Sequence, residues 1–320
     1  MSLRTDRVAP IGVKRVWRLA AAAALMLASG AANAEQCRQP EVALALGSGG
    51  AAGLSHIAML RVFEELDVEP AAIAGTSIGA IIGALYAAGL DADAIESVFR
   101  EFGGSALDPF SRLLDDDGAP GLTDLVEIDL DRGSVLDSGR FIEFLAERIE
   151  ARSFADLEIP LRIVATDFWT GEARVLEEGD LLEAVQASMA VPGLFAPVED
   201  GERLLIDGGA SNPLPVDLLE GYDIVVAIDV TGSRRPEVDG RPGVTDLLFS
   251  SFEIMQQSIL RARSSREDAD IYIKPELTDI RMLHFDRVGK VLEQSETAAR
   301  ELAGKLREKL ESISCGAVAP

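Results

Sequence analysis

The chain has 320 residues, 48% of them hydrophobic, and it carries a formal net charge of −24. A surface this acidic repels nucleic acid and anionic lipid, so the composition excludes a nucleic-acid-binding protein. The apolar content is enough for one sizeable core, and no internal repeat divides the sequence.

The first 34 residues have the pattern of a secretory signal peptide. Five basic residues come before the uncharged run from Leu19 to Ala34, which ends in the small-residue sequence Ala-Asn-Ala. The run is shorter than the roughly 20 apolar residues of a membrane span, which disfavours the alternative of an uncleaved anchor. We expect cleavage near Ala34 and export to the periplasm or the medium.

Loss of residues 1–34, which carry a net charge of +4, leaves a mature chain of 35–320 with a charge of −28. Any membrane contact of such a chain is expected to be peripheral and transient, and to use apolar groups or neutral lipid. The two cysteines, Cys37 and Cys315, bracket the mature domain. In an oxidising compartment they predict a disulfide, with two free thiols as the alternative. Neither lies at metal-ligand spacing, so no metal site is expected.

The stretch 41–60 combines an apolar strand, predicted at 42–46, a glycine-rich bend and the start of a helix. Such a bend directs backbone N–H groups toward an anion. Gly47, Gly49 and Ala52 satisfy the relaxed dinucleotide fingerprint G-x-G-x-x-G/A. A P-loop is excluded because no Lys-Ser/Thr pair follows Gly53. The bend therefore suits either a pyrophosphate or the oxyanion of a reaction intermediate.

A second strand, predicted at 71–77, leads into a helix through the pentad GTSIG at 75–79. The pattern G-x-S-x-G between a strand and a helix is typical of a nucleophile elbow, a strained turn that holds the serine hydroxyl exposed. Gly75 and Gly79 suit that turn because side chains there would collide with neighbouring strands. A tight turn in which Ser77 only caps the helix is the alternative.

The elbow decides how the glycine-rich bend is interpreted. A dinucleotide site needs an acidic residue at the end of the second strand, and the chain has Ser77 there. We therefore predict no nucleotide cofactor. The N–H groups of Gly49, Gly50 and Ala51 are expected to form an oxyanion hole for the intermediate that arises when Ser77 attacks a carbonyl.

Later in the chain, short apolar runs alternate with helical patterns, which indicates an α/β fold with a largely parallel sheet. Strands are predicted at 161–168, 203–207, 223–230 and 270–275, and a long helix at about 284–310. The segment 103–138, rich in Asp, Gly and Pro, is expected to be an irregular excursion, either a lid or an ordinary surface loop.

Ser77 needs a proton acceptor, and the chain has only two histidines, His56 and His284. His56 falls inside the helix after the Gly loop, where a packing or helix-positioning role is favoured over a catalytic one. His284 leaves open a triad in the order Ser, Asp, His. The other candidates are carboxylates that end predicted strands, which are Asp167, Asp207 and Asp229. We favour Asp207 because two glycines follow it and let the backbone turn away. Partial burial is expected to raise its pKa into the range of a useful base.

Four blocks in this order resemble the patatin-like phospholipase family. They are GSGGAAGLSHI at 47–57, GTSIG at 75–79, SMAVPGLFAPV at 188–198 and DGGASNPLPV at 207–216. The resemblance extends over about 41–310. It implies a three-layer α/β/α sandwich, a Ser77–Asp207 dyad, and hydrolysis of lipid or lipid-like esters without a metal. It also implies that the third block shapes a wall of the site and carries no chemistry.

Ala52 departs from the family pattern, which has a basic residue just before the last glycine of the loop. Backbone donors do not depend on that side chain, so the oxyanion hole is expected to persist. The departure leaves open a catalytically weak or silent module that binds lipid or protein.

Overall fold

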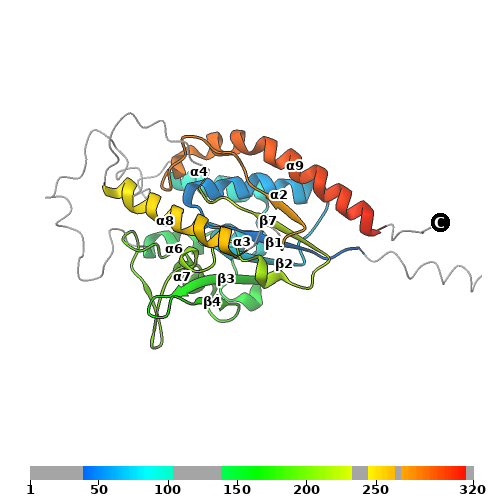
Figure 1. Cartoon of the computed structure of the whole chain (residues 1–320). Coiled ribbons are helices and arrows are strands. Elements are labelled where there is room, and N and C mark those ends of the chain that lie inside the picture. The colour runs from blue at the N-terminus through cyan, green and yellow to red at the C-terminus, as the bar shows by residue number, and fades with distance from the viewer. Residues whose placement is uncertain (1–38, 104–137, 233–243, 264–267, 315–320) are drawn as a thin grey trace, which may run out of the picture. The chain divides into compact units, whose positions relative to one another are not determined.

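The computed structural model describes residues 39–103, 138–232, 244–263 and 268–314, apart from the side chains of 244–246 and 314 (Figure 1). The predicted signal peptide, Cys37, Cys315 and all but the ends of the 103–138 segment lie outside these residues. The range Glu41–Lys309 forms one compact unit, which contains the site.

The elements follow one another as α/β units with short 3₁₀ turns (η) between them. In chain order they are β1 (Val42–Leu46), η1 (Gly50–Leu54), α2 (Ser55–Glu65), β2 (Ala72–Thr76), α3 (Ile78–Ala87), α4 (Ala92–Gly103), α6 (Gly139–Ala146), η3 (Phe154–Asp156), β3 (Leu161–Asp167), β4 (Ala173–Leu176), α7 (Leu181–Ser188), β5 (Val198–Asp200), β6 (Arg203–Asp207), η4 (Gly208–Ala210), η5 (Val216–Leu219), β7 (Ile224–Ile228), α8 (Val244–Ala262), β8 (Ile271–Ile273), η6 (Phe285–Arg287) and α9 (Val288–Ser314).

The described strands form one mixed sheet in which successive members of the series β5-β6-β3-β2-β1-β7-β8 are hydrogen-bonded to each other, and β4 also pairs with β3. The strands from β3 across to β8 are parallel, whereas β4 and β6 run antiparallel to β3. All six predicted strands are present at or just inside their expected bounds. The sequence analysis missed β4 and β5, which have four and three residues.

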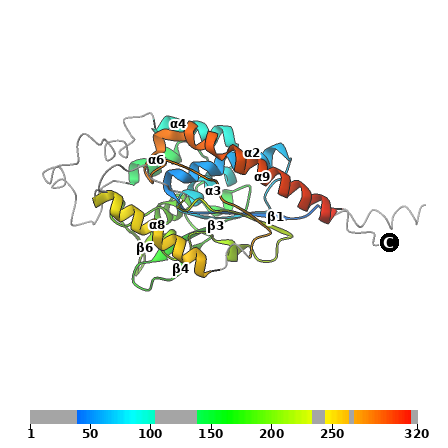
Figure 2. The same ribbon diagram turned by 45° about the horizontal axis from the view of Figure 1, so that its top comes forward.

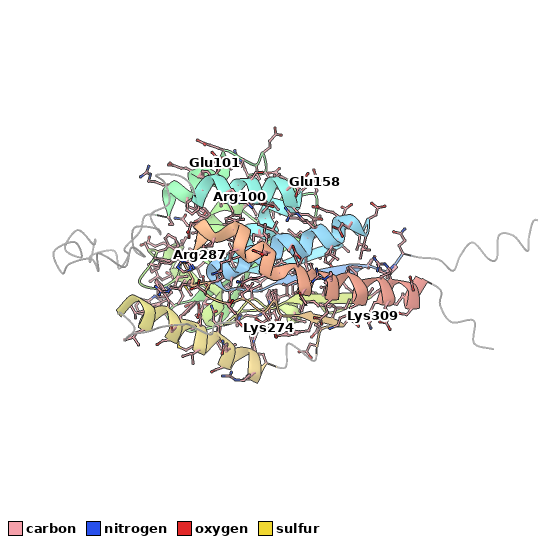
Figure 3. The ribbon with its side chains drawn as sticks, turned by 90° about the horizontal axis from the view of Figure 1, so that it is seen from above. Arg100, Glu101, Glu158, Lys274, Arg287 and Lys309 are labelled. Carbon is pink, nitrogen blue, oxygen red and sulfur yellow. The ribbon has the colours of Figure 1, made fainter. Side chains whose placement is uncertain are left out.

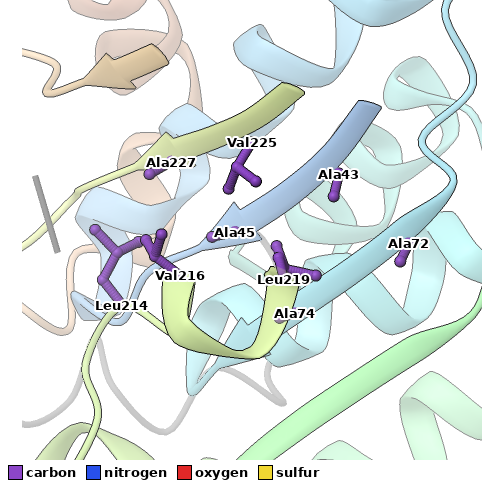
Figure 4. Close-up of a cluster of buried hydrophobic side chains, with 9 residues drawn as sticks. All are labelled: Ala43, Ala45, Ala72, Ala74, Leu214, Val216, Leu219, Val225 and Ala227. Atoms are coloured by element: carbon purple, nitrogen blue, oxygen red, sulfur yellow. The ribbon is translucent and has the colours of Figure 1, made fainter. Parts of the chain in front are cut away.

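Helical elements cover both faces of the sheet, which confirms the predicted layered α/β fold. On one face the alanines of β1 and β2 pack against η5 and against Leu260 of α8 (Figure 4). On the other face Leu46 and Ile73 lie against Gly83 of α3, where the missing side chain lets the helix approach closely. Figures 1 and 2 show α2 and α4 on one side of the sheet and α8 on the other.

None of the helices in the described ranges combines the length and the hydrophobicity of a bilayer span.

Candidate active site

Strands β2 and β6 meet end to end along one edge of β3. β2 pairs with 161–164 of β3 and β4 pairs with 163–166, so β2 and β4 lie on opposite edges. β6 pairs with 165–167 and therefore shares the edge of β2. Because β6 runs in the opposite direction to β2, the carboxyl ends of the two strands face each other.

This meeting brings the predicted nucleophile and the predicted base into contact. Thr76 is opposite Val164 of β3, and Asp207 is opposite the next residue, Ala165. Ser77 follows Thr76, and its Oγ donates a hydrogen bond to Oδ2 of Asp207 over 2.5 Å. Residues that lie far apart in the chain are thus adjacent because two strands end at the same point of a third.

Ser77 lies in a strained turn, as the pentad predicts. Its backbone has φ 57° and ψ −121°, a region that costs a non-glycine residue about 1–3 kcal/mol. A Cβ at position 75 would lie 2.6 Å from the Gly79 carbonyl oxygen. A Cβ at position 79 would lie 2.1 Å from the Leu46 oxygen. Neither position can accept a side chain without moving backbone.

The strained turn is held by Ser188, which lies at the end of α7. The Ser77 N–H donates to Ser188 Oγ over 2.8 Å, and that hydroxyl donates in turn to the Val164 carbonyl over 2.6 Å. Ser188 is fully buried. Sequence reasoning treated its block only as a wall of the site and missed this role. A serine at the end of an apolar helix, just before a predicted wall, is the signal that could have found it.

Asp207 has the environment of a base that works near neutral pH. It is fully buried, and Oδ1 accepts the Gly209 N–H over 2.7 Å. Burial raises the pKa of Asp207 to about 7, against the lowering effect of the bonds from Ser77 and Gly209. The following Gly208 is required by space, because a Cβ there would lie 2.1 Å from the Val164 oxygen.

The Gly loop reaches the same site. Gly49 and Gly50 line one pocket together with Ser77. Gly50 has φ +57°, and a Cβ on it would meet Met282 at 2.5 Å. The N–H groups of Gly49 and Gly50 have no acceptor among the described residues. The prediction that Ala51 is a third donor needs correction, because its N–H donates to the Met282 carbonyl over 2.8 Å.

His56 positions the Gly loop. Burial lowers its pKa to about 4, so the ring is neutral and fully enclosed. Nε2 lies 2.9 Å from the carbonyl oxygen of Gly47 and donates to it. The favoured prediction of a helix-positioning role agrees with this contact.

His284 does not complete a triad in this structure. Its Nδ1 accepts the backbone N–H of Arg281 over 3.0 Å, and burial lowers its pKa to about 4. Ser77 bonds directly to Asp207, with no imidazole between them.

The other two candidate carboxylates have structural partners. Asp167 accepts the N–H groups of Trp169 and Thr170 and so closes the turn after β3. Asp229 accepts from Thr231 and from Lys274 Nζ, the latter over 2.7 Å. Within the described ranges, no three His, Cys, Asp or Glu side chains gather in a way that could hold a metal ion.

The pocket in front of Ser77 is apolar and rich in aromatic rings. The third sequence block supplies Met189, Val191, Leu194 and Phe195, so the expected wall is present. The other aromatic rings come from α4, α6, α8 and η6, as Phe102, Phe141, Phe252 and Phe285.

Gln256 of α8 places a buried amide in this apolar pocket, and its Oε1 has no hydrogen-bond partner among the described residues. The free volume of the pocket is about 50 Å³, small beside the 300 Å³ or more of a typical ligand pocket.

The sequence model of the patatin-like phospholipase family matches residues 44–220, more than half of the chain. The chain belongs to the patatin-like phospholipase family. The four blocks named above, including the elbow and the Asp-Gly-Gly turn, all lie inside the matched residues of this patatin-like chain.

Among relatives, an uncharacterized NTE family protein of Mycobacterium tuberculosis is 32% identical over 209 residues, which is 64% of this chain and 54% of the relative. Human patatin-like phospholipase domain-containing protein 6 is 36% identical over 193 residues, 59% of this chain and 13% of that protein. The chain thus spans about half the length of the mycobacterial relative and a small part of the human one.

Two solved structures have similar folds at low sequence identity. VipD from Legionella pneumophila has a TM-score of 0.48 at 14% identity, covering 83% of this chain and 67% of VipD. Human GIVD cytosolic phospholipase A2, solved with methyl gamma-linolenyl fluorophosphonate, has a TM-score of 0.41 at 12% identity. That match covers 85% of this chain and 59% of the human one.

Proposed function

We propose that the protein is a serine acyl-ester hydrolase that cleaves lipid or lipid-like esters with a Ser77–Asp207 dyad. The observation that carries the proposal is the 2.5 Å contact between the hydroxyl of a strained serine and a fully buried carboxylate. It lies at a pocket whose lining of apolar and aromatic side chains matches the chemistry of an acyl chain. Membership of a phospholipase family supports the substrate class.

Acylation begins when Ser77 Oγ attacks the ester carbonyl. Its proton passes to Oδ2 of Asp207, which already accepts the hydrogen bond. The carbonyl oxygen becomes an oxyanion, and the N–H groups of Gly49 and Gly50 are the donors in reach of the pocket. Each fixed donor of this kind contributes about 3 kcal/mol to lowering a barrier. Asp207 then gives its proton to the departing alcohol.

Deacylation uses the same two side chains. A water molecule loses its proton to Asp207 and attacks the acyl group on Ser77. When the intermediate collapses, the Ser77 oxygen leaves and recovers the proton from Asp207. The raised pKa of Asp207 suits both directions of transfer, because a carboxyl with a pKa near 7 is a competent base and a competent acid at neutral pH.

The test is hydrolysis of a short p-nitrophenyl ester together with labelling by a fluorophosphonate probe. We expect the wild-type chain to turn over the ester and to take one probe at Ser77, and Ser77→Ala to do neither. A folded wild-type chain that is neither active nor labelled would identify the silent binding module that Ala52 leaves open.

We also propose that the protein works outside the cytoplasm after cleavage near Ala34, with Cys37 and Cys315 joined in a disulfide. The basic start and the uncharged run support export. Mass spectrometry of the protein from the cell envelope should give an N-terminus at Glu35 and a mass about two daltons lower without reductant than with it, because the disulfide lacks two hydrogens.

A further inference from the structure

Helix α8 has two apolar faces. Its inner face supplies Phe252 and Gln256 to the pocket in front of Ser77. Its outer face exposes Leu247, Leu248, Ile254 and Met255, whose exposed fractions are 54%, 60%, 60% and 54%. These pairs are seven residues apart, two helical turns, and therefore form a single stripe. Figure 3 shows α8, in yellow, along the edge of the molecule.

The stripe carries no charge although the protein is strongly acidic. Between Leu247 and Ser258 the described side chain with a charge is Glu253, and it is buried on the inner side of α8. From Leu247 onward, Arg261 is the first exposed charge among the described side chains of the helix, and it lies near the carboxyl end. In a chain with a net charge of −24, an uncharged stripe that ends in an arginine fits a neutral surface that carries phosphate groups.

We propose that this outer stripe of α8 docks the protein on a zwitterionic phospholipid surface. The inference rests on the proposed function, because a lipid hydrolase must take its substrate from such a surface. One helix then both contacts the lipid and forms a wall of the pocket that receives the acyl chain.

A lipid surface fits the stripe better than a protein partner does. Four half-exposed side chains are few compared with the 20–30 residues that a specific protein interface uses on each side. Interfacial helices need no more than such a stripe, since they bury it only about 5–10 Å into the headgroup region.

The docking test uses flotation with phosphatidylcholine vesicles and the full chain carrying Ser77→Ala, so that the lipid is not consumed. We expect the double substitution Ile254→Ser, Met255→Ser to lower vesicle binding at least ~10-fold. The control is Val175→Ser on β4, which removes a side chain of 36% exposure outside α8 and should leave binding unchanged. Any contribution of residues 1–34 is common to all variants.

A second measurement separates this inference from the proposed function. With Ser77 intact, the double variant should hydrolyse a soluble p-nitrophenyl ester at the wild-type rate and phosphatidylcholine vesicles at least ~10-fold more slowly. The inference is overturned if the double variant floats like its parent, or if the parent does not float. It is also overturned if sedimentation shows that the wild-type chain is a dimer and the double variant is a monomer, because the stripe would then be a protein interface. Failure of the proposed function gives a different result. Ser77→Ala would then leave turnover of the soluble ester unchanged, whatever the flotation experiment shows.

Discussion

Two buried aspartates lie at the carboxyl ends of strands in the same sheet, and the main difference in their surroundings is a cation. Asp229, after β7, has the ammonium of Lys274 at 2.7 Å and also accepts from Thr231 and Tyr272. Among the described residues, the carboxylate of Asp207, at the end of β6, accepts only from the Ser77 hydroxyl and the Gly209 amide. The ion pair with Lys274 ties the first carboxylate into the structure. The second has no cation beside it among the described residues, and burial therefore raises its pKa and prepares it to take a proton.

The largest effect should come from making each carboxylate neutral. Asp207→Asn removes the base, and we expect soluble-ester turnover to fall by at least ~10³-fold while the protein stays folded. Asp229→Asn should leave turnover within a few-fold of wild type but lower the free energy of unfolding by about 1–3 kcal/mol, because Lys274 loses its partner. Kinetics and urea unfolding measure the two effects. The comparison fails if Asp229→Asn is the inactive variant.

The second prediction concerns pH. The base must be ionised, so turnover of a soluble ester should rise with pH with a midpoint near 7, where burial has placed the pKa of Asp207. An unfolded aspartate has a pKa of about 3.9. Between pH 4 and 7 the folded state therefore holds more protons at this site than the unfolded state, and the contribution of Asp207 to stability falls as pH rises.

Asp207→Asn removes the pH-dependent contribution of Asp207 to stability. Comparing the variant with wild type therefore isolates that contribution. We expect the free energy of unfolding of Asp207→Asn, relative to wild type, to increase by a few kcal/mol between pH 4 and 7. The buried histidines His56 and His284 act in the opposite direction, since burial lowers the pKa of each to about 4. Their contribution is common to both proteins and cancels. A difference that does not change with pH would show that Asp207 titrates normally.

A smaller effect is expected at the serine that supports the strained turn. Ser188→Ala leaves the Ser77 N–H and the Val164 carbonyl without their partner, which should cost about 1–3 kcal/mol of stability. It should also lower kcat about tenfold by loosening the nucleophile. The matched control is Ser295→Ala, another fully buried serine, which bonds only to Val291 within α9. That variant should lose stability but keep kcat, and an equal fall in kcat would contradict the positioning role.

The smallest effect is expected at Ala52, where the Gly loop departs from the family pattern of a basic residue. Ala52→Arg restores a basic side chain to the loop, and the donors of Gly49 and Gly50 are backbone groups that it does not alter. Turnover of a neutral ester should change by less than about twofold, and stability by less than ~0.5 kcal/mol. Kinetics on an anionic phospholipid, run beside the neutral ester, should show the larger gain. A large gain on both substrates would show that the side chain takes part in the chemistry.

The sequence predicted those parts of the site that are encoded locally. The elbow around Ser77 and the turn after Asp207 are short patterns in which glycine spacing reflects hard steric limits, and both are present as expected. The pairing of Ser77 with Asp207 was predicted from the two glycines after Asp207 and from the family resemblance, and the structure adds the reason for their contact, which is the antiparallel β6. Its partner β5 has only three residues and leaves almost no periodic signal.

The errors concern contacts between distant parts of the chain. Ala51 lies in the same glycine-rich bend as Gly49 and Gly50, and the sequence does not set it apart. In the structure, however, its N–H donates to the carbonyl of Met282, which lies far away in the sequence. The position of Ser188 at the end of an apolar helix marks it as a candidate, but the sequence does not identify the Ser77 N–H, 111 positions away, as its partner. Such pairings depend on how helices and loops pack on the finished sheet, and a single sequence does not contain that information.

The end-to-end meeting of β2 and β6 on β3 also determines when the proposed dyad can first form during folding. A slip of one residue in either pairing would shift a strand by about 3.3 Å and take Ser77 out of reach of Asp207. A nascent chain of only the first 200 residues contains Ser77 but not its proposed base, Asp207. The proposed hydrolase activity therefore requires that β2 and β6 are both paired with β3 in their native registers. This requirement makes covalent capture of Ser77 a readout of completed folding.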